Sequence, residues 1–239
     1  VEAAGAGDAE KERAPRRKRV RLLSRRRRRG REATGEEAAE EAATWASKFK
    51  ITVIGGGSFG IAMASQVASK GIKTTLLVRK DTVADMINRD HRHPTYLSDL
   101  QLPTQIVASS DPREAFEGCT HVVHAVPAQF TRDYIRRVRK HIPAAAPILC
   151  LSKGIEKGSG KLMCDVLAEL LGEDRSYAFL SGPSFAREIV EGKATAVVIA
   201  STDSNLSYEL SDLLSSRSFR VFTTKDVVGV EVGGAVSLK

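Results

Sequence analysis

Cysteine, aromatic residues and long apolar runs are all scarce in this chain of 239 residues. Three cysteines, with no C-x-x-C spacing among them, are too few for a disulfide-stapled secreted scaffold. The longest clean apolar run, residues 194–200, has the length of a strand and is much shorter than the roughly 18 residues of a membrane span. We therefore expect a soluble chain with no membrane span and room for one large domain, or for one domain and an appendage.

Positive charge is concentrated in the N-terminal fifth of the sequence. Residues 1–50 hold 15 Lys and Arg against 9 Asp and Glu, whereas residues 51–239 hold 22 against 20. The net charge of +8 thus divides into +6 and +2. Because the part that can fold is close to neutral, no specific nucleic-acid partner is predicted for it.

Residues 1–47 have almost nothing bulky to bury, which predicts a disordered, basic and Ala/Glu-rich leader. Its Ala/Glu stretch, residues 36–43, has a helical tendency. Three interpretations stay open: a solvated leader or linker, an organelle transit peptide, and a polyanion-binding arm. Nine acidic residues fit the transit peptide badly, since such peptides are poor in acids.

A glycine-rich turn follows the first strand-like run of the folding part. Residues 51–54 are apolar and rich in β-branched side chains, and they lead directly into Gly55-Gly-Gly-Ser-Phe-Gly60. A helical pattern with Ile61, Ala64 and Val67 on one face comes next, and residues 74–78 form a second strand-like run. Strand, glycine turn, helix and strand within about thirty residues is typical of dinucleotide binding.

Each glycine of this turn has a predicted mechanical role. Gly55 permits the tight bend, Gly57 lets the backbone approach a pyrophosphate, and Gly60 lets the helix lie close to the strand. Amides at the start of the helix would then face the phosphates. A plain tight turn remains the alternative.

Strand-like and helical segments continue to alternate along the chain. The strand-like segments are 106–108, 121–126, 147–151, 177–180, 194–200 and 219–223, and the helical ones are 128–141, 161–171, 184–190 and 205–214. This alternation predicts an α/β fold with a Rossmann-like, doubly wound and mostly parallel sheet.

The end of the second strand bears on the choice of cofactor. The acidic residue that would hold a ribose 2′-hydroxyl is absent there, and Arg79 and Lys80 occupy its place. A basic pair could accommodate a 2′-phosphate. NAD and NADP both stay open, as does a purely solvated role for the two charges.

Two further segments follow strands and carry candidate site residues. Lys153 comes directly after residues 147–151, where its ammonium could protonate or hold an alkoxide oxygen, although an ordinary exposed lysine has the same spacing. The run Ser181-Gly-Pro-Ser-Phe-Ala186 opens a helix with Ser184 as its expected N-cap. A second helix N-terminus could also grip a substrate phosphate.

Six ordered motifs resemble those of NAD-dependent glycerol-3-phosphate dehydrogenases, over about residues 48–236. They are Gly55-Gly-Gly-Ser-Phe-Gly60, Val126-Pro-Ala-Gln129, Ser152-Lys-Gly154, Ser181-Gly-Pro-Ser-Phe-Ala186, Phe219-Arg-Val-Phe222 and Gly229-Val-Glu-Val-Gly-Gly-Ala235. The bacterial and plant plastid branches are the most similar. The resemblance implies reversible hydride transfer between NADH and dihydroxyacetone phosphate, giving glycerol 3-phosphate, in carbohydrate metabolism and glycerophospholipid biosynthesis. It also implies a homodimer and a chloroplast location, with the cytoplasm as the alternative.

The resemblance assigns roles to individual residues. Lys153 becomes an active-site lysine that contacts cofactor and substrate, and Gly182 and Ser184 line the substrate. The implied cofactor-binding residues are Gly55, Gly57, Ser58, Phe59, Gly60, Arg79, Lys80, Pro127, Lys153 and Ala186.

The sequence departs from the family at its C-terminal end. Ser237 stands where the family has its proton-donating lysine, and Lys239 is two residues late, about 200° further round a helix. We expect the family's helical second domain to have no counterpart in these residues. The expected division is a leader over 1–47, a dinucleotide-binding domain over 48–225, and the start of the helical domain over 226–239. Impaired activity is expected, with a catalytically dead NAD-binding remnant or regulatory module as the alternative.

Several conspicuous residues are interpreted as structural. Cys119, Cys150 and Cys164 are expected in or near the core, as are Phe116, Phe179 and Phe219. His121 and His124 bracket a buried strand, and His91 and His93 lie in a polar loop. No metal site is predicted, because no cluster of Cys or acidic residues accompanies the histidines.

Overall fold

The computed structural model describes residues 35–236. The chain divides into two units, 1–44 and 45–239. Residues 1–34, most of the predicted disordered leader, lie outside the described residues. In the rest of that leader, helix α2 spans Gly35–Ala46 and covers the Ala/Glu stretch for which a helical tendency was predicted. Alanine and glutamate have high intrinsic helix propensity, which agrees with a helix at this place.

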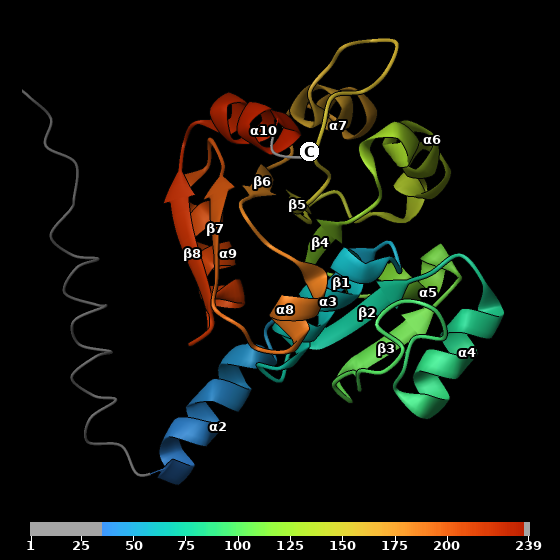
Figure 1. Cartoon of the computed structure of the whole chain (residues 1–239), viewed down its shortest axis with the longest axis vertical. Coiled ribbons are helices and arrows are strands. Elements are labelled where there is room, and N and C mark those ends of the chain that lie inside the picture. The colour runs from blue at the N-terminus through green and yellow to red at the C-terminus, as the bar shows by residue number, and fades with distance from the viewer. Residues whose placement is uncertain (1–34, 237–239) are drawn as a thin grey trace, which may run out of the picture. The chain divides into compact units, whose positions relative to one another are not determined.

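Eight strands form a single sheet within the second unit (Figure 1). Their order across the sheet is β3-β2-β1-β4-β5-β6-β7-β8. The strands are β1 (Lys50–Ile54), β2 (Lys73–Leu77), β3 (Ile106–Ser109), β4 (His121–His124), β5 (Ile148–Cys150), β6 (Tyr177–Ser181), β7 (Thr195–Ala200) and β8 (Phe219–Thr224). All neighbours pair in parallel except β6 and β7. The prediction of a mostly parallel, Rossmann-like sheet is confirmed.

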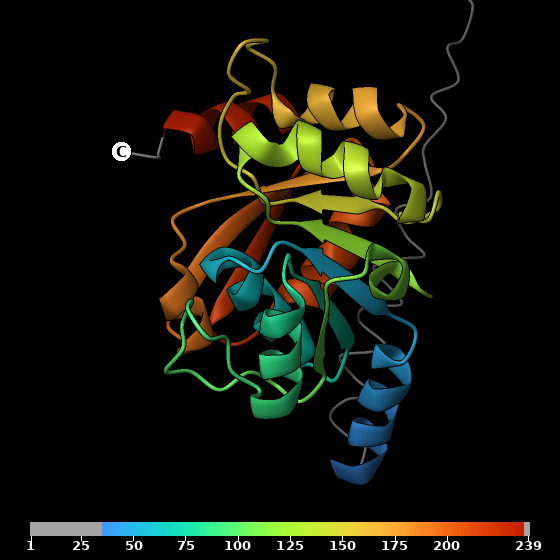
Figure 2. The same ribbon diagram turned by 90° about the vertical axis from the view of Figure 1, so that its right-hand side faces the viewer.

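Helices cover both faces of the sheet (Figure 2). The helices are α3 (Ser58–Ala68), α4 (Asp81–Asp90), α5 (Pro112–Phe116), α6 (Ala128–Val138), α7 (Met163–Leu171), α8 (Ala186–Val190), α9 (Ser204–Leu214) and α10 (Val227–Val236), with a 3-10 turn, η1, at Arg139–His141. Buried side chains of α3, α4, α8 and α9 share one hydrophobic core, and those of α5, α6 and α7 share another. Side chains that alternate along β1, β2, β4, β5 and β6 feed the two cores in turn, whereas β3, β7 and β8 contribute to the first core only.

The structural interpretations of the conspicuous residues agree with the burial. Cys119, Cys150, Phe116, Phe179 and Phe219 are buried, and Cys164 is partly buried. None of the helices in the described part of the chain has the length and apolarity that a bilayer crossing requires. Residues 35–236 also bring no three His, Cys, Asp or Glu side chains together as metal ligands.

Two helices were absent from the predicted alternation. Helix α4 buries only Ala84 and Ile87, so its apolar stripe is short, and it ends at His91 in a left-handed conformation. Helix α5 is a single short turn that Asp111 caps, with Pro112 at its first position. Both follow strands and start at Asp or next to it, which is a local signal for helix initiation.

Candidate functional site

The order of the strands reverses beside β1, which has β2 on one side and β4 on the other. In open α/β sheets, ligands bind at the carboxyl ends of the strands at such a switch point. The segments that follow β1, β2, β4, β5 and β6 all emerge at this edge, because these strands are parallel. They carry the residues predicted from sequence, which the fold therefore brings to one edge.

The glycine turn after β1 has the tight geometry predicted for it. Gly55 has φ +110°, and a Cβ there would lie 2.9 Å from the carbonyl oxygen of Ala125. A Cβ on Gly60 would lie 2.0 Å from the carbonyl oxygen of Gly55, so only glycine lets α3 start this close to β1. A Cβ on Gly57, in contrast, would meet nothing within 4 Å. The space beside Gly57 is thus open to a ligand.

At the N-terminus of helix α3, no side chain accepts a hydrogen bond from the first backbone amides. Its N-cap is Gly57, no side chain caps it, and its first turn has no acidic residue. The first amides of a helix carry the positive end of its dipole and bind anions when nothing else occupies them. Phe59, in the same turn, packs against the core. The arrangement can therefore receive a diphosphate.

The turn after β4 lies against the glycine turn. The amide of Ala125 donates to the carbonyl oxygen of Ile54 at 2.8 Å, and the hydroxyl of Ser152 donates to that of Val126 at 2.5 Å. Pro127 is the N-cap residue of α6. Behind this turn, Nε2 of the fully buried His124 lies 2.9 Å from Oγ1 of Thr131. Pro127 thus directly follows the two residues, Ala125 and Val126, that lie against the glycine turn.

Lys153 and Gly182 come together across the ends of β5 and β6. The ammonium Nζ of Lys153 donates to the carbonyl oxygen of Gly182 at 3.0 Å. Burial lowers the pKa of Lys153, because a half-buried ammonium loses hydration. The side chain is therefore a better proton donor at neutral pH than an exposed lysine would be.

The segment after β6 differs from the prediction in one respect. Ser184 is not an N-cap: α8 starts at Ala186, Phe185 is its N-cap residue, and no side chain caps the helix. The hydroxyl of Ser184 donates instead to the carbonyl oxygen of Gly182 at 3.3 Å. Gly182 has φ +147°, and a Cβ there would lie 2.9 Å from the carbonyl oxygen of Ala196 on β7. This backbone conformation, which favours glycine, accompanies a carbonyl of Gly182 that accepts hydrogen bonds from both Lys153 and Ser184.

Arg79 and Lys80 are both exposed at the end of β2. Lys80 is the N-cap residue of α4. The charge of Arg79 also acts on the phenol of Tyr134 in α6. Burial raises the pKa of this phenol, and the positive charges of Arg79 and Arg137 partly oppose the increase. The basic pair thus stands at the rim of the site, where it is free to meet a charged group.

Sequence reasoning gave no role to Glu231, although it lies in one of the motifs. Its carboxylate is buried in α10 and accepts hydrogen bonds from the amides of Met163 at 2.9 Å and Cys164 at 3.2 Å. A single charge in the otherwise apolar run Val227–Val236 was the available signal. Ser237 and Lys239, which follow α10, lie outside the described residues.

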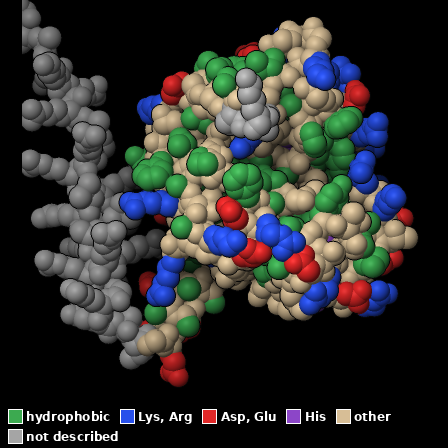
Figure 3. Space-filling view, in the orientation of Figure 1, with side chains coloured by type: hydrophobic (Ala, Val, Ile, Leu, Met, Phe, Trp, Pro, Cys, Tyr) green, Lys and Arg blue, Asp and Glu red, His purple; other side chains and the backbone are tan. Residues whose placement is uncertain are grey.

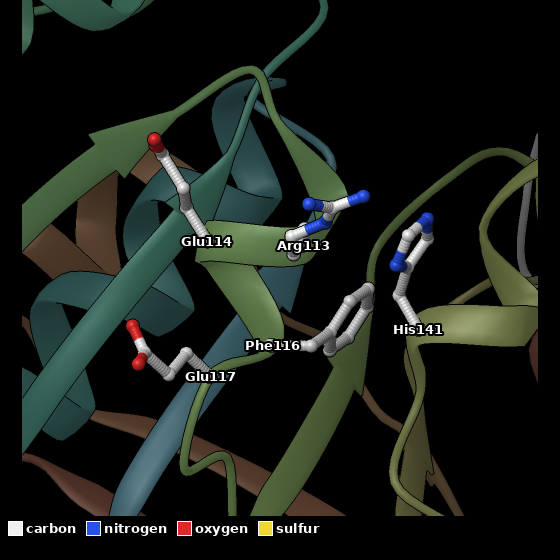
Figure 4. Close-up of a pocket in the computed structure, with 5 residues that line it drawn as sticks. All are labelled: Arg113, Glu114, Phe116, Glu117 and His141. Carbon is white, nitrogen blue, oxygen red and sulfur yellow. The ribbon is translucent and has the colours of Figure 1, made fainter.

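A hollow of about 370 Å³ lies elsewhere, between α5 and η1 (Figure 4). It is lined by Arg113, Glu114, Phe116, Glu117 and His141. The ammonium of Lys50, the first residue of β1, donates to the carbonyl oxygen of Glu117, which places the hollow toward the amino ends of the strands. No predicted site residue lines it.

Exposed apolar side chains gather on the face shown in Figure 3. The largest exposures among large hydrophobic residues belong to Phe130, Phe185 and Val236. Phe130 is on α6, Phe185 precedes α8 and Val236 ends α10, so all three lie on elements that follow the carboxyl ends of strands or flank them.

An open helix N-terminus after a glycine turn, at the switch point of a doubly wound sheet, defines a nucleotide-binding domain of the Rossmann type. Residues 50–207 match the family described as NAD-dependent glycerol-3-phosphate dehydrogenase N-terminus. The chain belongs to this family, and the resemblance seen in its motifs is confirmed.

Individual relatives are similar over the same part of the chain. A chloroplastic glycerol-3-phosphate dehydrogenase [NAD(+)] of Oryza sativa is 40% identical over 190 residues, and a glycerol-3-phosphate dehydrogenase [NAD(P)+] of Brucella ovis is 42% identical over 187. Each match covers 78% of this chain, but only 43% of the rice protein and 57% of the Brucella protein. The glycerol-3-phosphate dehydrogenase structure from Coxiella burnetii superposes with a TM-score of 0.73 at 33% identity, covering 78% of this chain and 57% of that one. The chain spans about half the length of these relatives.

Proposed function

We propose that this chain binds NAD(H) at the carboxyl edge of its sheet and takes part in hydride transfer between NADH and dihydroxyacetone phosphate, the reaction that forms glycerol 3-phosphate. The observation that carries the proposal is the open N-terminus of α3 beside Gly57, where a Cβ would meet nothing within 4 Å. The family and the names of the rice and Brucella relatives supply the reaction.

The residues present fit a dinucleotide. Gly55 and Gly60 are required by contacts within the protein, whereas Gly57 is required by none, so the space beside it is available to a diphosphate. Gly55, Gly57, Ser58, Phe59 and Gly60 would hold the diphosphate and neighbouring groups through backbone amides. When bound, the nicotinamide supplies or accepts the hydride.

Other predicted residues would surround the rest of the cofactor. Arg79 and Lys80 would lie near the adenosine side, Pro127 beside the nicotinamide ribose, and Ala186 against the cofactor from α8. The family resemblance made Ala186 a candidate, and the packing of α8 against α3 supports it. The exposed basic pair at the end of β2 also favours NADP as an alternative cofactor.

The chain's own chemistry centres on Lys153. Its ammonium would hold the C2 oxygen of dihydroxyacetone phosphate and supply the proton that this oxygen needs. Gly182 and Ser184 would line the same substrate, since both lie within hydrogen-bond reach of each other and Gly182 bonds Lys153. In this scheme, Lys153 leaves the Gly182 carbonyl when substrate arrives.

Titration of NADH with the full chain, followed by nucleotide fluorescence, tests binding. A Gly57→Glu variant is the matched negative, because its carboxylate would occupy the open space and repel the diphosphate. Absence of any fluorescence change at millimolar nucleotide in the wild-type chain contradicts the proposal. Comparison with NADPH measures the contribution of Arg79 and Lys80.

The second candidate function is a catalytically dead NAD-binding remnant or regulatory module. Oxidation of NADH with dihydroxyacetone phosphate separates the two functions. Turnover that depends on Lys153 supports the enzyme, and nucleotide binding without turnover supports the remnant.

We also propose a plastid location and a homodimer. The rice relative is named chloroplastic, while the Brucella relatives are bacterial, so the cytoplasm is the competing location. Imaging of the chain fused to a fluorescent protein checks the first, and light scattering of the purified chain checks the second. Heparin chromatography with and without residues 1–34 tests whether the leader binds polyanions instead.

A further inference from the structure

Helix α10 faces the rest of the domain with a charged residue and a glycine as its buried residues. The residues that it buries are Glu231 and Gly234, while Val228, Val232 and Val236 are 57%, 42% and 69% exposed. A helix on a protein surface normally buries its apolar stripe. The side chain that α10 buries most deeply is therefore a carboxylate, beside a partly buried apolar contact that Val227 makes with the core.

The buried carboxylate closes the start of another helix. Both oxygens of Glu231 accept backbone hydrogen bonds at the first two residues of α7, from the amides of Met163 and Cys164. The N-cap residue of α7, Leu162, has no side chain that could do this. Glu231 is thus a tertiary cap from 67 and 68 residues away, and the helix dipole of α7 adds to the two hydrogen bonds.

One turn further along the same face, α10 touches the candidate active site. Gly234 lies three residues after Glu231, on the same side of the helix. A Cβ on Gly234 would lie 2.7 Å from Oγ of Ser181 and 3.9 Å from Cγ of Lys153. The backbone of α10 therefore packs close to the end of β6, and the aliphatic part of Lys153 lies within reach of a side-chain carbon at position 234.

We propose that Glu231 is a positioning residue: by capping α7, it holds α10 in the place where Gly234 covers the stem of Lys153. The inference rests on the proposed function, which gives Lys153 its catalytic role. It assigns to Glu231 an indirect role in that chemistry.

The electrostatics of both groups agree with this arrangement. Burial raises the pKa of Glu231, so the two amides and the helix dipole only partly offset the cost of removing its charge from water. Burial also lowers the pKa of Lys153. If α10 moved away, water would reach the lysine, and the pKa of its ammonium would rise toward the ordinary lysine value of about 10.4.

Competitive acetylation of the full chain without nucleotide, read by mass spectrometry over a pH series, measures the pKa and access of Lys153. Four variants are compared with the wild type. Glu231→Ala removes the cap, and Glu231→Gln keeps its size with a single acceptor oxygen. Gly234→Val leaves the Glu231 side chain in place and puts a Cβ against Ser181 and the stem of Lys153. Glu173→Gln, on the exposed residue beyond the end of α7, is the charge-matched control.

We expect the Lys153 profile to move to higher pH in Glu231→Ala and in Gly234→Val, by a smaller amount in Glu231→Gln, and not at all in Glu173→Gln. Hydrogen exchange at the amides of Met163 and Cys164 should become about tenfold faster in Glu231→Ala, as expected for the loss of one hydrogen bond to a charged group.

A Lys153 profile in folded Glu231→Ala that coincides with the wild type overturns the proposal. If Glu231→Ala does not fold, Glu231→Gln decides: a wild-type profile there, beside a shifted one in Gly234→Val, also overturns it. Failure of the proposed function is observed separately: the wild-type protein then does not bind NADH, while the acetylation profiles of the Glu231 and Gly234 variants still shift.

Discussion

The ammonium group of Lys153 donates a hydrogen bond to the carbonyl oxygen of Gly182, 3.0 Å away, and so links the ends of β5 and β6. The two residues are 29 positions apart and were both predicted as site residues from separate motifs. Gly182 can present its carbonyl here because its φ of +147° is open to glycine and strained for other residues. The bond orients the lysine before any substrate is bound.

Replacement of Lys153 by Met should lower the rate of NADH oxidation with dihydroxyacetone phosphate by about 10² to 10⁴, the usual contribution of a proton donor. Stopped-flow absorbance of NADH measures the rate. Lys157→Met, in the exposed part of the same loop, is the control and should retain the wild-type rate. Equal rates for wild type and Lys153→Met would remove Lys153 from the chemistry.

Gly57→Ala should separate nucleotide binding from folding. The added methyl group meets no protein atom within 4 Å, so the thermal midpoint should change little, whereas the methyl occupies the space that a diphosphate needs. We expect NADH affinity to fall by about tenfold or more, equivalent to about 1.4 kcal/mol. Gly233→Ala in α10 is the control, because its added Cβ also has open space and lies outside the glycine turn. Unchanged affinity in Gly57→Ala would place the diphosphate elsewhere.

His124 should make stability depend on pH below neutrality. Burial lowers the pKa of His124 to about 4, compared with about 6.5 in an unfolded chain. Between these values the unfolded chain binds a proton that the folded chain does not, so stability rises with pH over this window, by about 3 kcal/mol in total. Urea denaturation of wild type and His124→Leu from pH 4 to 7 measures the slopes.

The slope should flatten in His124→Leu and persist in His141→Leu, which removes a half-buried histidine at the hollow of Figure 4. Parallel slopes in wild type and His124→Leu would mean that another group titrates.

Arg132 should stabilise the loop that carries Lys153. It donates two hydrogen bonds to Glu156, at 2.8 and 2.9 Å, and a third to Glu169 at 2.9 Å. These bonds lower the pKa of Glu156 to about 2. Because the folded-state pKa is depressed, this contribution to stability is present above the unfolded value of about 4.3 and is lost as pH falls toward 2.

Arg132→Met should therefore lower stability at pH 7 by about 1 kcal/mol, a modest value because the pair is partly in water. It should also weaken the acid dependence between pH 4.3 and 2, as measured by urea midpoints. Arg136→Met, whose guanidinium is exposed and 3.8 Å from Asp133, should do neither. An acid dependence that is identical in wild type and Arg132→Met would contradict the assignment to Glu156.

Local patterns were sufficient for the strands and for the glycine turn. In residues 51–60, a run of β-branched residues is followed directly by a glycine-rich run. This local pattern predicts a strand and then a tight turn, so both the bend at Gly55 and the close approach at Gly60 were predictable. Helix α4 was missed because it buries only two side chains, which leaves a weak apolar period. Serine is a common N-cap residue, but α8 starts at Ala186 and Phe185 is its N-cap, so Ser184 lies outside the helix.

The sequence by itself determined the fold class, the family and the residues that gather at the carboxyl edge, because these depend on short motifs and on the direction of parallel strands. Only the tertiary structure decided that β7 runs antiparallel to β6, that Lys153 meets Gly182, and that Glu231 caps α7. Each of these joins segments distant in the chain, and such contacts are selected by packing of the whole domain. Local sequence preferences therefore cannot predict these contacts.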